Sequence, residues 1–495
     1  MSAGEDEIEL KFLCEPADLA AVLAAAPVGE TYEKTLVSTY FDTPQGDLRR
    51  ARISLRIREG GSKKVQTLKR GDGFAREEHE KPINGEGLDL TLPALKDALP
   101  TAAKRASLAP IFTVRVVRRQ RTFDYGGATI EMAVDEGEVQ AGERSRRVSE
   151  VELELKAGDC SPMFDLAREL SKTAPLYLSF DGKASQGQGL IDGTDRSPRR
   201  HDKAPLARGL TAAGAFQAIA RNTLVQIAAN GVVLRQADSV EAVHQLRVAV
   251  RRLRSTISTF KNVVDDGRAD EIASELKWLA GACDEARDFD VFAAEVAKFD
   301  DPAVDLAPLL AAVEAARARG HAKACAAVAS GRFRELVLET TAWVEIGAWL
   351  TQGGKASAKR RDMPAERFAA KALDRRRKAL LKRGADLEAQ DDAGRHEARI
   401  AAKKLRYSAE AFAALFESQA GKASIKSLKR LQDQLGLMND AAVAGALVER
   451  LKLKGKALAA ARQLLALREA ERPKTAKAAV KAMDQVTAAP PFWVG

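Results

Sequence analysis

The hydrophobic pattern of this chain changes its period once, near residue 200. Before that point short segments such as 53–58 (ISLRIR) alternate polar with apolar residues, which predicts β-strands. The polar run from Gly182 to Lys203 has the composition of a linker. After it, Ala, Leu, Arg, Lys and Glu recur at helical spacing. The sequence therefore predicts a strand-rich domain over 1–195, a linker over 196–205 and an all-helical domain over 206–490.

Composition and cysteine usage indicate a globular protein of the cytoplasm. Of the 495 residues, 45% are apolar and 30% charged, and no apolar run is long enough to cross a bilayer. The first residues, Met1 to Glu9, are acidic, which is the wrong sign for a secretory signal peptide. The four cysteines are scattered without a CxxC pair. This pattern argues against a disulfide framework or a zinc site and favours a reducing compartment.

The charge balance predicts an anionic partner. The formal net charge is +10, which suits nucleic acid, an anionic membrane or a small polyanion. Aromatic residues make up only 5% of the chain, whereas proteins that bind single-stranded nucleic acid rely on aromatic stacking. We therefore expect an anionic partner that carries no bases, and we do not expect a membrane as partner.

The helical half contains an internal repeat. His244 and His396 lie 152 residues apart (396 − 244), and the same offset aligns Phe216 with Phe368 and Asp288 with Asp440. The shared pattern is HxxRxxx(R/K)(R/K)LR, and it carries two of the five histidines of the chain in register. A duplication of this kind predicts two pseudo-symmetric helical bundles, over about 206–350 and 360–490.

Each repeat carries a basic stripe at helical spacing. Positions 244, 247, 251 and 254 follow one another by three, four and three residues, so they share one helix face about 15 Å long. A solvated basic face is the simpler interpretation of one such stripe, but its recurrence in register favours a binding role. The two ladders comprise His244, Arg247, Arg251 and Arg254, and His396, Arg399, Lys403 and Arg406.

The strands of the first domain carry charge at alternate positions. Residues of one parity share a strand face, and acids dominate the first and last strands while cations dominate the strands between. Three glutamates on one face repel one another unless a cation neutralises them, and oxygen ligands alone favour a hard ion such as Mg²⁺ or Mn²⁺. The acids are Glu7, Glu9, Glu150, Glu152 and Glu154, and the cations are Arg56, Arg58, Lys69 and Arg118.

These residues resemble the CYTH superfamily, the triphosphate tunnel metalloenzymes. The resemblance begins at Glu7-Ile8-Glu9-Leu10-Lys11-Phe12, which is similar to the ExExK signature. It continues in the order of the family through Tyr40-Phe41-Asp42-Thr43-Pro44, Leu55-Arg56-Ile57-Arg58, Leu68-Lys69, Arg118, Glu131 to Asp135, Glu150 to Lys156 and Lys183. One departure follows Lys183, where Gln186 stands before Gly187 in place of a basic residue.

The resemblance implies an α+β protein whose first domain is a closed, mostly antiparallel barrel of eight strands around a charged tunnel, with flanking helices. It implies hydrolysis of inorganic triphosphate to diphosphate and phosphate, with Mg²⁺ or Mn²⁺ as cofactor. The implied metal ligands are Glu7, Glu9, Glu150, Glu152 and Glu154. The implied triphosphate-binding residues are Lys11, Arg56, Arg58, Lys69, Arg118 and Lys183, and the implied catalytic set is Glu7, Glu9, Lys11, Glu152 and Glu154.

The helical half resembles the CHAD domain, which is often found behind a CYTH domain. The resemblance rests on Val243-His244-Gln245-Leu246-Arg247, on Arg287-Asp288-Phe289-Asp290 and on the counterparts from His396 to Arg406 and from Leu435 to Asp440. It implies polyphosphate binding along both ladders, with Asp288 and Asp440 orienting basic side chains, and a possible association with polyphosphate granules.

Three alternatives stay open at the level of sequence. The first domain could be another tunnel enzyme, a class IV adenylate cyclase or a thiamine triphosphatase, because sequence does not reveal the shape of the tunnel mouth. The chain could instead be a non-catalytic protein of polyphosphate granules, although a pure binder has little use for an acidic metal cluster. Nucleic-acid binding by the basic helices is disfavoured by the lack of interleaved aromatic residues.

Overall fold

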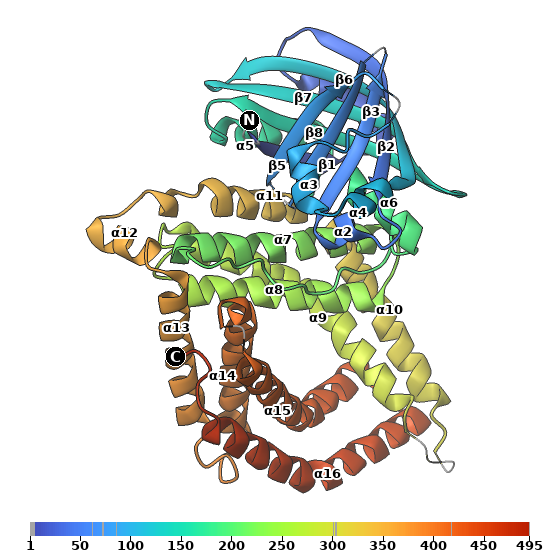
Figure 1. Cartoon of the computed structure of the whole chain (residues 1–495). Helices are drawn as coiled ribbons and strands as arrows, with labels where there is room; N and C mark the ends of the chain where they lie inside the picture. Colours follow the sequence, from blue (N-terminus) through green and yellow to red (C-terminus); the bar gives the residue numbers. More distant parts are fainter. Residues whose placement is uncertain are drawn as a thin grey trace. The chain divides into compact units, whose positions relative to one another are not determined.

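A computed structural model describes residues 5–61, 63–71, 74–85, 87–299, 301, 304–416 and 418–494, without the side chains of 5, 6, 75, 76 and 439–442. The chain separates into two compact units, Met1–Pro198 with Val337–Ala342, and Arg199–Leu336 with Trp343–Gly495. The first is built on a sheet and the second is helical (Figure 1), which confirms the expected α+β class. Among the described residues, no helix is both long and apolar enough to cross a membrane.

One antiparallel sheet forms the first unit, and its nine described strands run in the order β5-β4-β3-β2-β6-β7-β8-β1-β9. Alternation of polar and apolar side chains lets each strand turn one face towards charged residues and the other towards an apolar layer. The strands are β1 (Glu5–Leu13), β2 (Thr31–Asp42), β3 (Ile53–Gly60), β4 (Lys63–Arg70), β5 (Ala75–Ile83), β6 (Ala109–Tyr125), β7 (Ala128–Ala141), β8 (Arg144–Ala157) and β9 (Tyr177–Ser179).

The expected closed barrel of eight strands needs correction at strand β1. This strand pairs with β8 through Glu9 to Leu13, and β9 pairs with Lys11 to Leu13, so β9 occupies the second edge of β1. Strand β5 reaches β1 only at Glu5 to Ile8. The sheet therefore has nine strands and is not closed along its length, because the short β9 takes the part of the edge that β5 does not reach.

Apolar side chains on the outer face of the sheet pack against short helices. Leu55 and Leu68 belong to one buried cluster with Leu95 and Leu99. Helix α5 buries five residues of one face, including Phe164 and Leu170, and contacts β8. The helices of this unit are α1 (Leu19–Ala25), α2 (Asp47–Arg50), α3 (Pro93–Ala98), α4 (Ala102–Ala106), α5 (Ser161–Thr173) and α6 (Lys183–Asp192), with a 3₁₀ turn, η1 (Pro16–Asp18).

The run from Gly182 to Lys203, whose composition suggested a linker, instead begins with a helix, because α6 occupies Lys183–Asp192. This helix buries Lys183, Gln186, Gly187 and Leu190. At Gly187 an added Cβ would lie 2.3 Å from the ring of Phe112, so the helix approaches strand β6 more closely than any side chain allows. The glycine that suggested a linker is thus a packing requirement of a helix.

The second unit consists of helices whose order repeats. Helices α7 and α13, α8 and α14, α9 and α15, and α10 and α16 begin 153, 152, 151 and 148 residues apart, which agrees with the sequence repeat. They are α7 (Ala212–Gln236), α8 (Val240–Phe260), α9 (Arg268–Val296), α10 (Ala307–Ala329), α11 (Gly331–Ile346), α12 (Lys355–Arg361), α13 (Ala365–Arg383), α14 (Asp392–Ala411), α15 (Gln419–Leu451) and α16 (Gly455–Ala488), with 3₁₀ turns η2 (Ala348–Leu350) and η3 (Ala413–Phe416).

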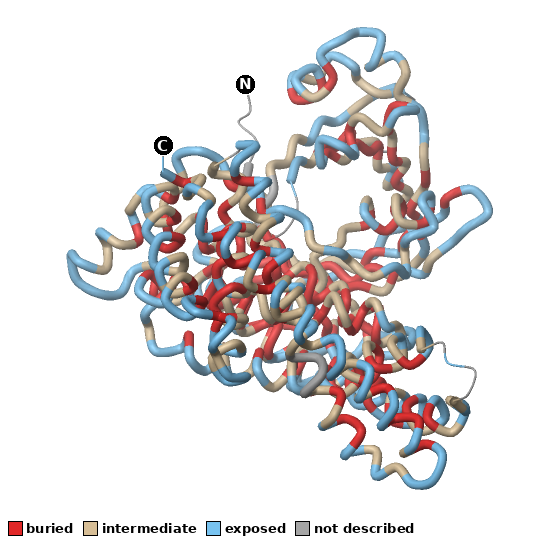
Figure 2. The backbone as a smooth tube through the Cα atoms, turned by 90° about the horizontal axis from the view of Figure 1, so that it is seen from below, coloured by how far each residue is buried: buried red, intermediate tan, exposed pale blue. Residues whose placement is uncertain are grey.

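Equivalent residues of the two repeats contact one another directly. The amide of Ala212 donates to the carbonyl of Met363 (2.7 Å), and the amide of Ala365 donates to the carbonyl of Leu210 (2.8 Å). Phe260 and Phe412, 152 residues apart, lie with ring centroids 5.7 Å from each other. Figure 2 shows buried backbone concentrated where the helices of this unit pack together. The repeats therefore share one apolar seam.

Candidate active site

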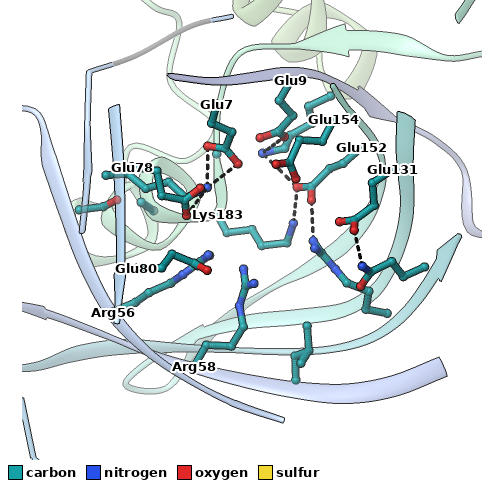
Figure 3. A pocket seen from close by; sticks show the side chains of 18 of the residues that line it. Glu7, Glu9, Arg56, Arg58, Glu78, Glu80, Glu131, Glu152, Glu154 and Lys183 are labelled. Atoms are coloured by element: carbon teal, nitrogen blue, oxygen red, sulfur yellow. Dashed lines mark hydrogen bonds and ion pairs between the residues drawn. The ribbon is translucent and has the colours of Figure 1, made fainter. Parts of the chain in front are cut away.

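A cavity of about 270 Å³ lies on the charged face of the sheet in the first unit. Most of the residues that line it are charged, and Figure 3 shows their side chains converging. The lining consists of Glu7, Glu9, Lys11, Lys34, Leu36, Tyr40, Ser54, Arg56, Arg58, Lys69, Glu78, Glu80, Arg118, Gln120, Glu131, Glu152, Glu154, Lys156, Gly182, Lys183 and Ala184.

The acids of the first and last long strands meet because β1 pairs with β8. Glu9 lies opposite Glu154 in the register, and Lys11 lies opposite Glu152. Glu7, from the start of the same strand, joins them on the same side of the cavity (Figure 3). Strand parity alone predicts which side chains share a face, but only the pairing brings these two strands together.

Glu152 is the centre of a buried ion network. Its carboxylate accepts from Lys183 (2.8 Å) and Arg118 (2.5 Å) and lies 3.2 Å from the ammonium of Lys11. Burial alone would raise the pKa of Glu152, but these three cations outweigh it and hold the pKa well below its usual range. Arg118 also donates two hydrogen bonds to Asp135, of 2.7 and 2.6 Å.

Glu154 has the opposite electrostatic environment. Burial raises the pKa of its carboxyl, and the nearby Glu7 and Glu131 act in the same direction, against the ion pair with Lys156 at 2.6 Å. A cation placed among acids that raise one another's pKa stabilises their ionised forms. Glu131 was not among the predicted ligands.

The chemistry of this acidic side fits a hard metal ion, because every candidate ligand is a carboxylate. No group of three His, Cys, Asp or Glu side chains is arranged around one point within the part of the chain that the structure describes. Glu7 lies 2.7 Å from Lys69, and Glu9 lies 3.2 Å from Lys11. A metal ion would therefore compete with lysines for these carboxylates.

The opposite side of the cavity carries two arginines of strand β3, with Glu80 beside Arg56 (Figure 3). Burial and the charges of the neighbouring Arg56 and Arg118 together lower the pKa of Arg58 to about 10. The Nε atoms of Arg56 and Arg58 are buried and have no hydrogen-bond partner among the described residues. Arg56 donates instead to the hydroxyl of Tyr40 through Nη1, at 3.4 Å. Buried, unmatched guanidinium groups of this kind suit an anion that brings its own oxygens.

Two predicted residues have surroundings that differ from their implied roles. Glu150 is not among the described lining residues of the cavity; it is 1% exposed and accepts from Lys183 (2.9 Å) and from Gln186. Lys69 lies between Glu7 (2.7 Å) and Glu78 (3.1 Å), so it faces acids rather than open space. Gln186, which stands where the family pattern has a basic residue, thus donates its side-chain amide to Glu150 and holds that carboxylate in place.

The remaining predicted residues of the first domain come together, and several others join them. Ten of the eleven side chains assigned from the sequence line the one cavity, and Glu150 is the exception. Glu78 and Glu80 could have been found from the alternation in β5, because Glu78 pairs in register with Lys69. The residues missed were Lys34, Tyr40, Ser54, Glu78, Glu80, Gln120, Glu131 and Lys156.

The basic ladders lie on helices α8 and α14 of the second unit, and their residues differ in environment. Burial lowers the pKa of His244, and the nearby Arg287, Arg251 and Arg247 act in the same direction, against Glu241. Arg247 pairs with Asp284. Arg254, Arg399 and Lys403 are partly buried, whereas His396 is exposed.

Arg406, the last ladder residue, and the two repeated aspartates, Asp288 and Asp440, also differ in their surroundings. Arg406 donates to Gln432 (2.8 Å) and pairs with Glu410. Burial raises the pKa of Asp288. The side chain of Asp440 lies outside the described residues.

Comparison with known proteins finds two family matches. A CYTH domain matches residues 5–187 and a CHAD domain matches residues 218–449. An inorganic triphosphatase of Haemophilus influenzae is 30% identical over 195 residues, which are 37% of this chain and 54% of that protein. The chain thus spans about half the length of that relative.

Two further similarities extend over the helical half. An uncharacterised protein of Mycobacterium tuberculosis is 26% identical over 429 residues, 81% of this chain and 80% of that protein. The crystal structure of the CHAD domain from the plant Ricinus communis is 31% identical, with a TM-score of 0.53, and covers 60% of this chain and 99% of that one.

Proposed function

The chain is a CYTH–CHAD protein, and on this basis we propose that its first domain hydrolyses inorganic triphosphate while its second binds polyphosphate. The proposal for the first domain agrees with its similarity to the triphosphatase of Haemophilus influenzae. The observation that carries it is the pair Arg56 and Arg58, which line the cavity side by side and whose buried Nε atoms have no hydrogen-bond partner among the described residues. Cations with unmatched donors suit an anion, and the charged lining of the cavity suits a chain of phosphates.

The side chains divide the work of phosphoryl transfer, which depends on positioning and on charge stabilisation. Arg56 and Arg58 bind non-bridging oxygens with their forked donors. Lys11, Arg118 and Lys183 are held by Glu152, so their charges are already fixed in position before the substrate arrives.

The acidic side supplies the base and the place for a metal ion. Glu154 has a raised pKa, which makes it a stronger base than an exposed glutamate, and it accepts a proton from the attacking water. Glu7 and Glu9, with Glu131 nearby, are the carboxylates that would hold Mg²⁺ or Mn²⁺, while Glu154 acts as the base beside the ion. Such an ion, when bound, neutralises phosphate charge. Glu150 positions Lys183 and is not a ligand in this proposal.

The test of this activity is phosphate release from tripolyphosphate, ATP and thiamine triphosphate, with Mg²⁺ or Mn²⁺. We expect tripolyphosphate to be turned over fastest. Arg58→Gln should lower kcat/KM on the order of 100-fold, as the loss of one electrostatic stabiliser does elsewhere. Arg119→Gln is the matched control, because Arg119 lies on β6 outside the cavity and pairs with Glu33 at 3.0 Å. Unchanged turnover in Arg58→Gln contradicts the proposal, and cyclic AMP production from ATP favours the cyclase alternative.

For the second domain we propose that the ladders bind polyphosphate without turning it over. Rows of Arg, Lys and His suit an evenly charged, flexible polyanion, and neither ladder holds an evident nucleophile. Binding should weaken steeply as salt is added, because the polyanion releases counterions. The test is the affinity for labelled polyphosphate over a salt series, with an RNA of equal phosphate number as comparison. Equal affinity for the RNA would overturn the choice of polyphosphate.

A further inference from the structure

A stripe of amide side chains on helix α7 binds a segment that has no part in the proposed function so far described. Asn222, Gln226 and Asn230 follow one another at four-residue spacing, so they lie on one face of the helix. Gln226 is 3% exposed and Asn230 is fully buried. Buried amides in an otherwise apolar helix are costly unless they are hydrogen-bonded, so their partners indicate what they are for.

Their partner is the extended segment 199–203 (RRHDK), which we call the strap. The amide of Arg199 donates to Oδ1 of Asn230 (3.1 Å), and Nδ2 of Asn230 donates back to the carbonyl of Arg199 (3.0 Å). Nδ2 of Asn222 donates to the carbonyl of Asp202 (2.8 Å), and Gln226 lies 3.4 Å from Nδ1 of His201. The strap is therefore fixed to α7 through its backbone, and it presents one histidine at a set position.

His201 lies within the electrostatic influence of two arginines, one from each repeat. Burial and the charges of Arg252 on α8 and Arg406 on α14 together lower the pKa of His201 to about 4, against Asp202 of the strap itself and the hydrogen bond with Gln226. Arg252 and Arg406 share one aromatic ring and one acid. Both lie over Tyr407, with guanidinium carbons 5.9 and 4.6 Å from the ring centroid, and both pair with Glu410.

The cluster has more donors than acceptors. Arg252 donates to Glu410 through Nη2 (2.7 Å), while its Nε and Nη1 atoms are buried and have no hydrogen-bond partner in the described part of the chain. The Nε atom of the adjacent Arg251, a ladder residue, is likewise buried and has no hydrogen-bond partner among the described residues. Two guanidinium groups against one carboxylate leave a positive site, which excludes a cation as ligand. Unmatched, forked donors fit an anion with several oxygens.

We propose that His201, Arg252 and Arg406 form an anion subsite where the two repeats meet, and that this subsite takes one phosphate group of a bound polyphosphate. The inference rests on the proposed polyphosphate binding of the helical domain and assigns the strap a part in it. The strap is a fixed wall of the site, because a displaceable lid would leave two buried amides unpaired. Binding there favours protonation of His201, so the subsite gains affinity as pH falls.

The experiment measures the affinity of the full-length protein for labelled inorganic polyphosphate at one salt concentration and at several pH values. Arg252→Gln should weaken binding on the order of ten-fold, since it removes a charge-assisted hydrogen bond. His201→Gln should reduce the gain in affinity between pH 8 and pH 5. Arg319→Gln is the matched control, since it removes an equal charge from an exposed position on α10, and it should change the affinity less than two-fold.

A second readout follows the strap itself. Trypsin cuts after Arg199, Arg200 and Lys203, and polyphosphate should protect these bonds in the wild-type protein but not in Arg252→Gln. Asn230→Ala should expose them in the absence of ligand. Unfolding followed by tryptophan fluorescence verifies that each variant is folded.

The outcomes separate the two levels of the proposal. Normal affinity and normal protection in both His201→Gln and Arg252→Gln, with weaker binding in Arg399→Gln, overturns the subsite and leaves polyphosphate binding intact. A wild-type protein that does not bind polyphosphate overturns both.

Discussion

Replacing Asp135 with asparagine tests whether the charged face of the sheet is held together by its buried ions. Asp135 is fully buried and lies 2.6 Å from Arg118 and 2.8 Å from Lys183. In this network three cations (Lys11, Arg118 and Lys183) pair with four acids (Glu9, Asp135, Glu150 and Glu152). Asp135→Asn removes the carboxylate that Arg118 and Lys183 share, and breaking a buried ion pair from one side typically costs about 3–5 kcal/mol. For a domain of this size, such a loss lowers Tm on the order of 10 °C.

The pH dependence of this effect has a definite sign. Burial alone would raise the pKa of Asp135, but Lys183 and Arg118 outweigh it and lower the pKa below its usual value. A carboxyl with a depressed pKa contributes stability that is complete above its unfolded pKa of about 3.9 and is lost as pH falls through the folded value. The difference in stability between the wild type and Asp135→Asn should therefore be constant near neutral pH and shrink below about pH 4.

The assay must report the first domain alone. All four tryptophans, Trp278, Trp343, Trp349 and Trp493, follow residue 199, so their fluorescence follows the helical domain. Hydrogen exchange of β6 and β7 peptides in increasing urea follows the sheet. Glu136→Gln is the matched control, because Glu136 is the next residue on β7 and its pair with Arg147 is exposed (2.9 Å), a contact worth about 0–1 kcal/mol. Destabilisation by Asp135→Asn that is no larger than that of Glu136→Gln would refute the reasoning.

Three further outcomes are expected. Glu7→Ala or Glu9→Ala should abolish metal-dependent phosphate release while leaving tryptophan-monitored unfolding unchanged; retained turnover would end the assignment of the acidic side. Polyphosphate affinity should rise as pH falls, but His244, whose pKa is lowered by burial and by Arg287, should contribute only at a more acidic pH than an exposed histidine does; His244→Gln tests this by titration of binding against pH. Gly187→Ala should destabilise the sheet domain by about 1–3 kcal/mol, because its Cβ would lie 2.3 Å from Phe112; unchanged hydrogen exchange in β6 would show that α6 can shift.

Much of the cavity could be predicted because strand parity is a local property. Side chains two residues apart on a strand lie on the same face, independently of the rest of the chain. This period places Glu7 with Glu9, and Arg56 with Arg58. The repeat of the helical half was equally visible, since two rare histidines in register mark it. Helix starts 151 to 153 residues apart for three of the four pairs agree with that offset.

What could not be predicted depends on contacts between distant segments. The parity of Glu150 matches that of Glu152, yet Lys183 and Gln186 of α6 cover it, and the sequence of β8 contains no sign of that helix. The ninth strand and the partial contact between β5 and β1 are likewise set by the lengths of segments that meet only in the fold. The glycines of α6 have two possible meanings in a sequence, because close packing and a flexible linker both favour glycine.

The reciprocal hydrogen bonds between Leu210–Ala212 and Met363–Ala365 join the two repeats through matching positions. A surface that is complementary to its own duplicate is the kind on which symmetric dimers form. A single repeat, such as 206–350, therefore presents half of an isologous interface, and we expect it to dimerise when produced alone. Light scattering that finds only monomers would exclude this; dimers would indicate how a self-pairing ancestor, once fused to its copy, became one continuous domain.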